Sequence, residues 1–187
     1  MVAQFVTIGH SNRSLDEFVD MLRAAQVEMV IDVRAFPRSR SNPAFNTDRL
    51  PEDLARVQIG YRHMPALGGR RAKQPGVDEN LNALWWVQSF HNYADYALGA
   101  AFAGAFHDLV SLGRDHRLAL MCSEAVWWRC HRRIITDHLL LGGHAVDHLM
   151  APGHSEHATP TPGVQKDTQG RVIYPASAAP DHEQPPG

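Results

Sequence analysis

The sequence has few of the features that would place it among disulfide-stapled or membrane-spanning proteins. Its 187 residues include only two cysteines, Cys122 and Cys130, and both lie in one short segment. Such a pair makes no disulfide framework, although a bridge between them is geometrically possible. No apolar run approaches the roughly 18 uninterrupted residues of a membrane helix, and the first residues carry no charged leader. We therefore expect a cytoplasmic protein with reduced thiols and no membrane partner.

A strong net charge and internal repeats are also absent. The formal net charge is -2, so no overall field favours nucleic acid or a membrane surface. Basic residues nevertheless outnumber acidic ones between Arg34 and Lys73, which suits that stretch to face an anion. The length fits one domain with an extension. We expect a single α/β domain over residues 1–150. The segment 151–187, rich in Pro, His and Gly, is expected to be disordered or loosely attached.

Short apolar runs alternate with amphipathic stretches, which predicts a three-layer α/β fold. The expected sheet is mostly parallel, with about five short strands and helices on both faces. Within the helical stretches, Ser14 and Glu17 predict a helix N-terminus, and residues 90–112 predict one long helix ended by Gly113. The order of the strands does not follow from the sequence. The predicted strands cover residues 4–8, 29–33, 59–64, 118–121 and 145–150.

Reactive side chains gather around residues 117–141, where a predicted strand, a loop and a helix start follow one another. In α/β proteins such a junction binds ligands, because unpaired amides and the helix dipole point at one spot. The residues after the first two predicted strands should meet the same edge of the sheet. We expect one cleft containing catalytic residues Cys122, Glu124 and His131, anion-binding residues Arg34, Arg38, Arg132, Ser11 and His10, and supporting residues Asp32 and Cys130.

Within this cleft, Cys122 is the expected nucleophile because it ends a strand at the open edge. Positive surroundings would lower the pKa of its thiol from about 8.5, and Glu124 or His131 would move protons. Cys130 is expected to pack, and packing alone is an alternative for both thiols. The arginines suit a phosphate or carboxylate. Arg129 lies one position too far from Cys122 for the cysteine–five residues–arginine loop of phosphatases, so no phosphatase is predicted.

These residues resemble a bacterial and archaeal family known only as domain of unknown function 488. The resemblance covers nearly all of residues 5–150, and it implies an α/β fold and a shared site without an established reaction. Trp127 departs from the pattern, where proline is frequent. The segments that carry the resemblance include Thr7-Ile8-Gly9-His10-Ser11, Asp32-Val33-Arg34, Asn42-Pro43-Ala-Phe45-Asn46, Leu67-Gly68-Gly69-Arg70-Arg71, Tyr93-Ala94-Asp95-Tyr96, Met121-Cys122-Ser-Glu124 and Cys130-His131-Arg132.

Three functions fit these observations. The favoured one is an enzyme that uses a thiol on a small anionic, phosphate-bearing or nucleotide-like substrate, without a cofactor. A metal site is a second possibility, with ligands from Cys122, Cys130, His131 and either His10 or Glu124. The spacing of the cysteines is far from the usual two to four intervening residues of structural zinc sites, which argues against it. A third is weak binding or processing of nucleic acid by the basic loops and their neighbouring aromatic residues. The reaction, the substrate and the oligomeric state do not follow from the sequence.

Overall fold

A six-stranded sheet forms the centre of the part of the chain that the computed structural model describes, residues 4–176. Its strand order is β3-β2-β4-β1-β5-β6, and all neighbours run parallel except β5 and β6. The predicted α/β class and all five predicted strands are confirmed, whereas β6 was not expected. The strands are β1 (Phe5–Gly9), β2 (Met29–Asp32), β3 (Gly60–His63), β4 (Leu118–Cys122), β5 (Val146–Ala151) and β6 (His154–His157).

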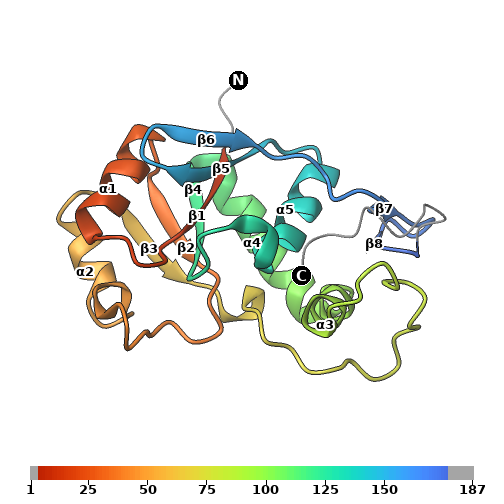
Figure 1. Ribbon diagram of the computed structural model, residues 1–187. Coiled ribbons are helices and arrows are strands. Elements are labelled where there is room, and N and C mark those ends of the chain that lie inside the picture. The colour runs from red at the N-terminus through yellow and green to blue at the C-terminus, as the bar shows by residue number, and fades with distance from the viewer. Residues whose placement is uncertain (1–3, 177–187) are drawn as a thin grey trace.

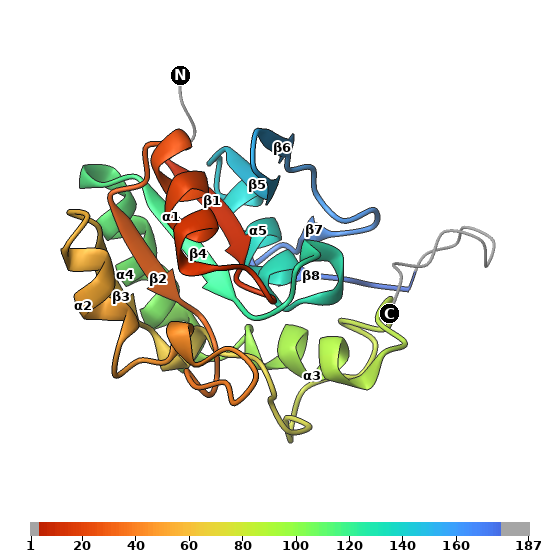
Figure 2. The same ribbon diagram turned by 60° about the vertical axis from the view of Figure 1, so that its left-hand side comes forward.

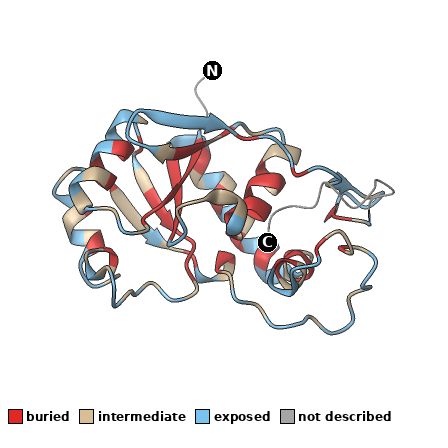
Figure 3. Ribbon diagram, viewed as in Figure 1, coloured by how far each residue is buried: buried red, intermediate tan, exposed pale blue. Residues whose placement is uncertain are grey.

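Helices cover both faces of the sheet (Figure 1). Val6 and Ile8 of β1 belong to the core formed with α1 (Leu15–Ala24) and α2 (Leu50–Ala55). Phe5 belongs to the opposite core, formed with α3 (Gln88–Tyr96), α4 (Ala100–Asp115) and α5 (Arg132–Leu141). Central parallel strands are therefore apolar on both sides, and Figure 3 shows them buried between the two helical layers. The three-layer arrangement is confirmed.

Ser14 accounts for the helix prediction that succeeds, and two glycines account for the one that fails. Ser14 caps α1 as predicted, because its hydroxyl accepts a hydrogen bond from the Glu17 backbone at 3.1 Å. The single helix predicted for residues 90–112 is wrong: the chain forms α3 and α4, and Gly99 between them is extended at φ -90° and ψ 169°. Gly113 does not end α4 either. A Cβ atom there would lie 2.3 Å from the Phe5 ring, so Gly113 allows the helix to approach β1 closely.

The chain after residue 150 forms short strands and is anchored to the domain by a few buried residues, so the prediction of a loosely attached tail is wrong for residues 151–176. β6 extends the sheet, and β7 (Gln165–Lys166) pairs with β8 (Val172–Ile173). Tyr174 is fully buried, and its hydroxyl donates to Asp137 of α5 at 2.7 Å. The Thr161 backbone N–H donates to the other oxygen of Asp137 at 2.8 Å. Composition could not reveal these long-range hydrogen bonds. Residues 177–187 lie outside the described residues.

The strand order brings the carboxyl ends of β1, β4 and β2 together (Figure 2). The register pairs Gly9 with Cys122 and Asp32 with Met121. From β1 the chain crosses to β2 through α1 on one face, whereas from β4 it crosses to β5 through α5 on the other. Ligand crevices in α/β sheets open where adjacent connections diverge in this way. No helix in residues 4–176 is long and apolar enough to cross a membrane.

Candidate functional site

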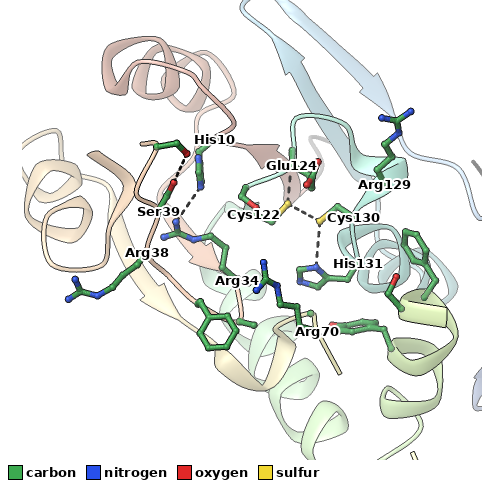
Figure 4. A pocket seen from close by; sticks show the side chains of 18 of the residues that line it. His10, Arg34, Arg38, Ser39, Arg70, Cys122, Glu124, Arg129, Cys130 and His131 are labelled. Atoms are coloured by element: carbon green, nitrogen blue, oxygen red, sulfur yellow. Dashed lines mark hydrogen bonds between the residues drawn. The ribbon is translucent and has the colours of Figure 1, made fainter. Parts of the chain in front are cut away.

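A cavity of about 890 Å³ opens at this edge of the sheet (Figure 4). Its walls come from the ends of β1 and β4, the loops after β2 and β3, and the starts of α3 and α5. Seven of the ten predicted site residues line it, whereas Ser11, Asp32 and Arg132 lie behind the wall. The seven are His10, Arg34, Arg38, Cys122, Glu124, Cys130 and His131.

The two cysteines lie against each other at the floor of the cavity. Their Sγ atoms are 2.8 Å apart, and the residues are only 2% and 4% exposed. Cys122 ends the central strand β4, whereas Cys130 follows the short 3-10 turn η3 (Trp127–Arg129) and lies two positions before the first residue of α5. The backbone N–H of Arg132, at the helix start, points at Cys130 Sγ from 3.4 Å. The pair is therefore held by two regular elements.

His131 is oriented so that it can take a proton from Cys130. Its Nε2 lies 2.7 Å from the carbonyl oxygen of Val33, which can only accept a hydrogen bond, so Nε2 carries the hydrogen. In the neutral ring, Nδ1 then has a free lone pair, and it lies 3.5 Å from Cys130 Sγ. A nucleophile, a base and a third group that orients the base form the usual arrangement of an activated thiol.

Gly69 leaves room for this imidazole. A Cβ atom at Gly69 would lie 2.9 Å from His131 Nδ1. On another side, the ring of Tyr93 packs with its centroid 5.1 Å from that of His131. The Tyr93 hydroxyl donates to the carbonyl of Leu67 at 2.7 Å and so ties α3 to the loop that carries Gly69. Gly69 and Tyr93 thus define the space that the His131 ring occupies.

Arg132 lies beneath the thiols and is only 1% exposed. Its guanidinium donates to the Thr7 hydroxyl at 3.2 Å and to the Glu124 carbonyl at 2.7 Å, both neutral acceptors. Among residues 4–176 it forms no ion pair with a carboxylate. A buried charge without a counter-ion is costly, and the adjacent groups that can supply a negative charge are the two thiols. The site therefore favours one thiolate.

The negative charge belongs on Cys130. Burial alone raises the pKa of a thiol, but at Cys130 the hydrogen bond from Cys122 and the positive charges of His131 and Arg132 outweigh it, and the pKa lies well below its ordinary value. Burial and the hydrogen bond to Cys130 raise the pKa of Cys122 well above its ordinary value. Cys122 Sγ also faces the Glu124 carbonyl at 3.8 Å. This geometry favours the opposite assignment to the one expected from sequence.

Gly9 lets the Cys122–Glu124 loop cross the end of β1. A Cβ atom at Gly9 would lie 1.7 Å from the Glu124 carbonyl oxygen, so no other residue fits there. The same carbonyl accepts the hydrogen bond from Arg132. The Glu124 side chain itself is exposed at the cavity wall.

Asp32 and Arg34 form a buried ion pair beside the thiols. Asp32 accepts hydrogen bonds from Arg34 Nε at 2.9 Å and from Nη2 at 2.7 Å, so the guanidinium is fixed. Its Nη1 faces His10 Nε2 at 3.3 Å. His10 Nδ1 donates to the Ser11 carbonyl at 3.0 Å, and burial, with the charge of Arg34, lowers the pKa of His10. His10 is therefore neutral, and Ser11 contributes its backbone to the site.

Exposed arginines surround the mouth of the cavity. Arg38 and Arg129 point away from the thiols at opposite ends of Figure 4, and Arg70 lies between them with its guanidinium 5.5 Å from the Phe36 ring centroid. Glu124 is the one carboxylate among the described residues of the lining. Sequence reasoning did not place Arg40, Arg70 and Arg129 in the cleft.

The sequence places both Arg70 and Arg71 in a basic loop but does not show which of the two faces the cavity. Arg71 lies with its guanidinium 4.0 Å from the Tyr96 ring centroid and donates to the carbonyls of Gly68 and Pro65. Arg71 is absent from the lining of the cavity described here, whereas Arg70 is part of it. One arginine of the pair is thus structural, and the other faces the ligand space.

Of the metal ligand set considered from sequence, Cys122, Cys130 and His131 lie side by side, whereas His10 faces Arg34 and the Glu124 side chain is exposed at the wall. In the described part of the chain, no group of three or more His, Cys, Asp or Glu residues is placed to hold a metal ion. The nitrogens of His10 are engaged by Arg34 and the Ser11 carbonyl, and His131 Nε2 is engaged by Val33. These ring nitrogens therefore contact protein groups and are not directed at a common metal position.

The fold and the site together define an α/β protein with paired thiols at the topological switch point of its sheet. A family model described as domain of unknown function DUF488 matches residues 14–139. The chain belongs to this family, as its resemblance indicated. The match includes both cysteines, His131, Arg132 and the Asp32–Arg34 pair. No significant match was found among curated proteins or solved structures.

Proposed function

We propose that the protein is an enzyme that uses the Cys130 thiolate as a nucleophile toward an anionic substrate. The observation that carries the proposal is the buried Arg132, which has neutral acceptors, two adjacent thiols and, within residues 4–176, no carboxylate partner. Maintaining an uncompensated guanidinium there would be costly, so a resident thiolate explains the arrangement. A depressed thiol pKa beside a histidine and a helix start is typical of reactive cysteines.

The neighbouring groups supply the proton transfers of such a reaction. His131 Nδ1 takes the proton of Cys130 in the free protein, and the resulting imidazolium can return a proton to a leaving group. The Val33 carbonyl keeps the ring in the required orientation throughout. Glu124, exposed at the wall, is available to the far side of a bound substrate, where it could orient a water molecule or a substrate hydroxyl group.

The arginines indicate which substrates fit. Five arginines line the cavity, namely Arg34, Arg38, Arg40, Arg70 and Arg129. Of these, Arg34 is buried beside Asp32, whereas Arg38 and Arg129 project at opposite ends of the opening (Figure 4). Guanidinium groups bind phosphate and carboxylate in a forked geometry. Aromatic rings of Phe36, Phe90 and Tyr93 also line the space. The volume of about 890 Å³ lies within the range of roughly 300–1,000 Å³ for ligand pockets. We favour a phosphorylated ligand with a planar group, such as a nucleotide.

Alkylation kinetics test the nucleophile and the anion site together. Iodoacetamide should label Cys130 faster than Cys122 near neutral pH, and peptide mass spectrometry would separate the two sites. Inorganic phosphate or a nucleoside monophosphate should slow labelling in the native protein. The protection should be lost in Arg70→Ala and kept in Arg56→Ala, an exposed arginine on the surface beside α2. Equal, slow labelling of both thiols, without protection, would reject the proposal.

Nucleic acid is the second candidate, and the position of the arginines at the mouth favours it. Arg38 and Arg129 project at opposite ends of the opening, and Phe36 is 66% exposed. A single strand crossing the mouth could place phosphates on these arginines and stack a base. If four phosphates were bound, the log–log slope of affinity against salt would be roughly -3 to -4. Arg70→Ala should flatten that slope, with Arg56→Ala as the control. A slope near zero would reject nucleic acid and leave a small anion as the ligand.

A further inference from the structure

We propose that Cys122 and Cys130 are a redox pair in which Cys122 is the resolving thiol. A sulfur substituent that becomes bonded to Cys130 is displaced by Cys122, and the two cysteines end as an intramolecular disulfide. This activity rests on the Cys130 thiolate of the proposed function and goes beyond it, because it gives Cys122 a chemical role and requires no phosphorylated substrate. It rests on the geometry of the pair and on the surroundings of Arg132.

The two sulfur atoms can bond without rearrangement of the backbone. They are 2.8 Å apart in the free protein, and a disulfide requires about 2.05 Å. Cys122 is the last residue of β4, which is paired on both sides by β1 and β2. Cys130 lies two positions before α5, whose first residue, Arg132, donates to its sulfur through the backbone N–H. Small side-chain movements therefore suffice.

A low-molecular-weight disulfide such as oxidised glutathione is the class of oxidant that fits. The Cys130 thiolate attacks one sulfur atom of that disulfide, whose other half leaves as a thiolate. Cys122 then loses its proton, attacks Cys130 Sγ, and releases the second half as a thiol that takes this proton. Two protein thiols are oxidised and one external disulfide is reduced, so two electrons are transferred. Both cysteines are almost buried, so the oxidant must enter through the cavity.

Arg132 destabilises the disulfide form of this pair, compared with a disulfide that has no buried charge beside it. In the reduced protein, the thiolate compensates its buried charge, whereas the disulfide is neutral. The oxidised form would leave a guanidinium with neutral acceptors, and its Nε already has no hydrogen-bond partner within the described residues. Interactions that stabilise the reduced form make a dithiol pair a stronger oxidant. The pair should therefore be reduced readily and should pass its oxidation on to other thiols.

Reaction with oxidised glutathione tests the order of events. The full-length protein is mixed with oxidised glutathione, quenched in acid and examined by mass spectrometry. The native protein should lose two hydrogens and retain no glutathione. Cys122→Ser should accumulate a mixed disulfide on Cys130, whereas Cys130→Ser should react at least tenfold more slowly. A persistent mixed disulfide in the native protein, or faster reaction of Cys130→Ser, would overturn the proposal.

Equilibration in glutathione buffers tests the part played by Arg132. Arg132→Met should shift the equilibrium at least tenfold toward the disulfide, and Arg132→Lys should shift it less. Should Arg132→Met fail to fold, the native protein still provides the test, because its reduced form should show thiolate ultraviolet absorbance near neutral pH that disappears when the disulfide forms. Absence of this absorbance in the reduced protein, or an unchanged equilibrium in a folded Arg132→Met, would overturn this part. Oxidised glutathione carries carboxylates that the arginines of the cavity can bind, so a neutral disulfide such as 2-hydroxyethyl disulfide separates the two proposals. It should oxidise the pair in the same order even if phosphate fails to protect Cys130 from alkylation.

Discussion

Two buried arginines flank the site, and their surroundings differ in one respect. Arg34 is 5% exposed and Arg132 is 1% exposed, so both side chains are shielded from solvent. Arg34 is neutralised by Asp32, which accepts from two of its nitrogens. Arg132 contacts a hydroxyl, a carbonyl and the thiol pair. The first arginine is thus a cation compensated by a carboxylate, whereas the second requires its negative charge from sulfur.

This difference shows that Arg34 has a structural role, whereas Arg132 influences the reactivity of the thiols. The Asp32 carboxylate binds two nitrogens of the Arg34 guanidinium and so holds Arg34 toward the cavity. A thiol is ordinarily protonated at neutral pH, so Arg132 changes the protonation state of its partner. The predictions below separate these two roles.

Removing the carboxylate should have the largest effect. Asp32→Asn leaves Arg34 buried without a counter-ion and should lower the free energy of unfolding by about 3–5 kcal/mol. Urea unfolding followed by circular dichroism measures it. Asp48→Asn breaks the exposed pair with Arg38 and should cost less than about 1 kcal/mol. Similar small losses in both variants would show that Asp32 does not compensate Arg34.

Removing the second arginine should change reactivity more than stability. In Arg132→Met, Cys130 can take up a proton, so no unpaired charge is left behind. We expect its thiolate fraction at neutral pH to fall at least tenfold, which corresponds to about 1.4 kcal/mol. The pH dependence of the thiolate ultraviolet absorbance measures this, with Arg132→Lys as the matched control. An unchanged pKa of Cys130 in Arg132→Met would contradict the role assigned to Arg132.

Acid should destabilise the protein through a histidine that Arg132 also influences. Thr7 accepts from Arg132 and donates to His148 Nδ1 at 2.7 Å, and burial, with the charge of Arg132, lowers the pKa of His148 from 6.5 to about 3. The folded pKa is depressed, so this stabilisation is present above pH 6.5 and is lost as the pH falls toward 3. The loss should approach about 1.4 kcal/mol per pH unit.

Chemical unfolding across pH 4–7 measures this loss. Burial also lowers the pKa values of His138, to about 4, and of His10, so the contribution of His148 is the difference in slope between the native protein and His148→Gln. A slope that is unchanged when His148 is replaced by glutamine would refute the assignment.

A methyl group beside the base should have the smallest effect. Gly69→Ala places a Cβ atom 2.9 Å from His131 Nδ1, so the imidazole must shift by a few tenths of an ångström. We expect a several-fold slower alkylation of Cys130. Gly104→Ala is the control, because no atom lies within 4 Å of its added Cβ and the change should stabilise α4 by about 0.5–1 kcal/mol. Equal alkylation rates in the two variants would show that the position of the ring is not critical.

The fold could be predicted where its signals are local. Short runs rich in apolar or β-forming residues identified the five parallel strands, and Ser14 identified the start of α1. The tail could not be predicted, because Tyr174 is ordered by Asp137, 37 positions away in the chain. The break between α3 and α4 was missed for a related reason. Tyr93 and Tyr96 bind the carbonyls of Leu67 and Ala66, which holds α3 over the loop after β3 while α4 lies against the sheet.

The sequence by itself determined that the thiols, His131 and Arg34 would meet, because residues that follow parallel strands share one edge of the sheet. Only the tertiary structure decided which sulfur bears the charge. That choice depends on Arg132 turning inward to Thr7 and on Val33 selecting the tautomer of His131. Both contacts join residues about a hundred or more positions apart, and the free energy of a buried charge depends on the groups that surround it in space.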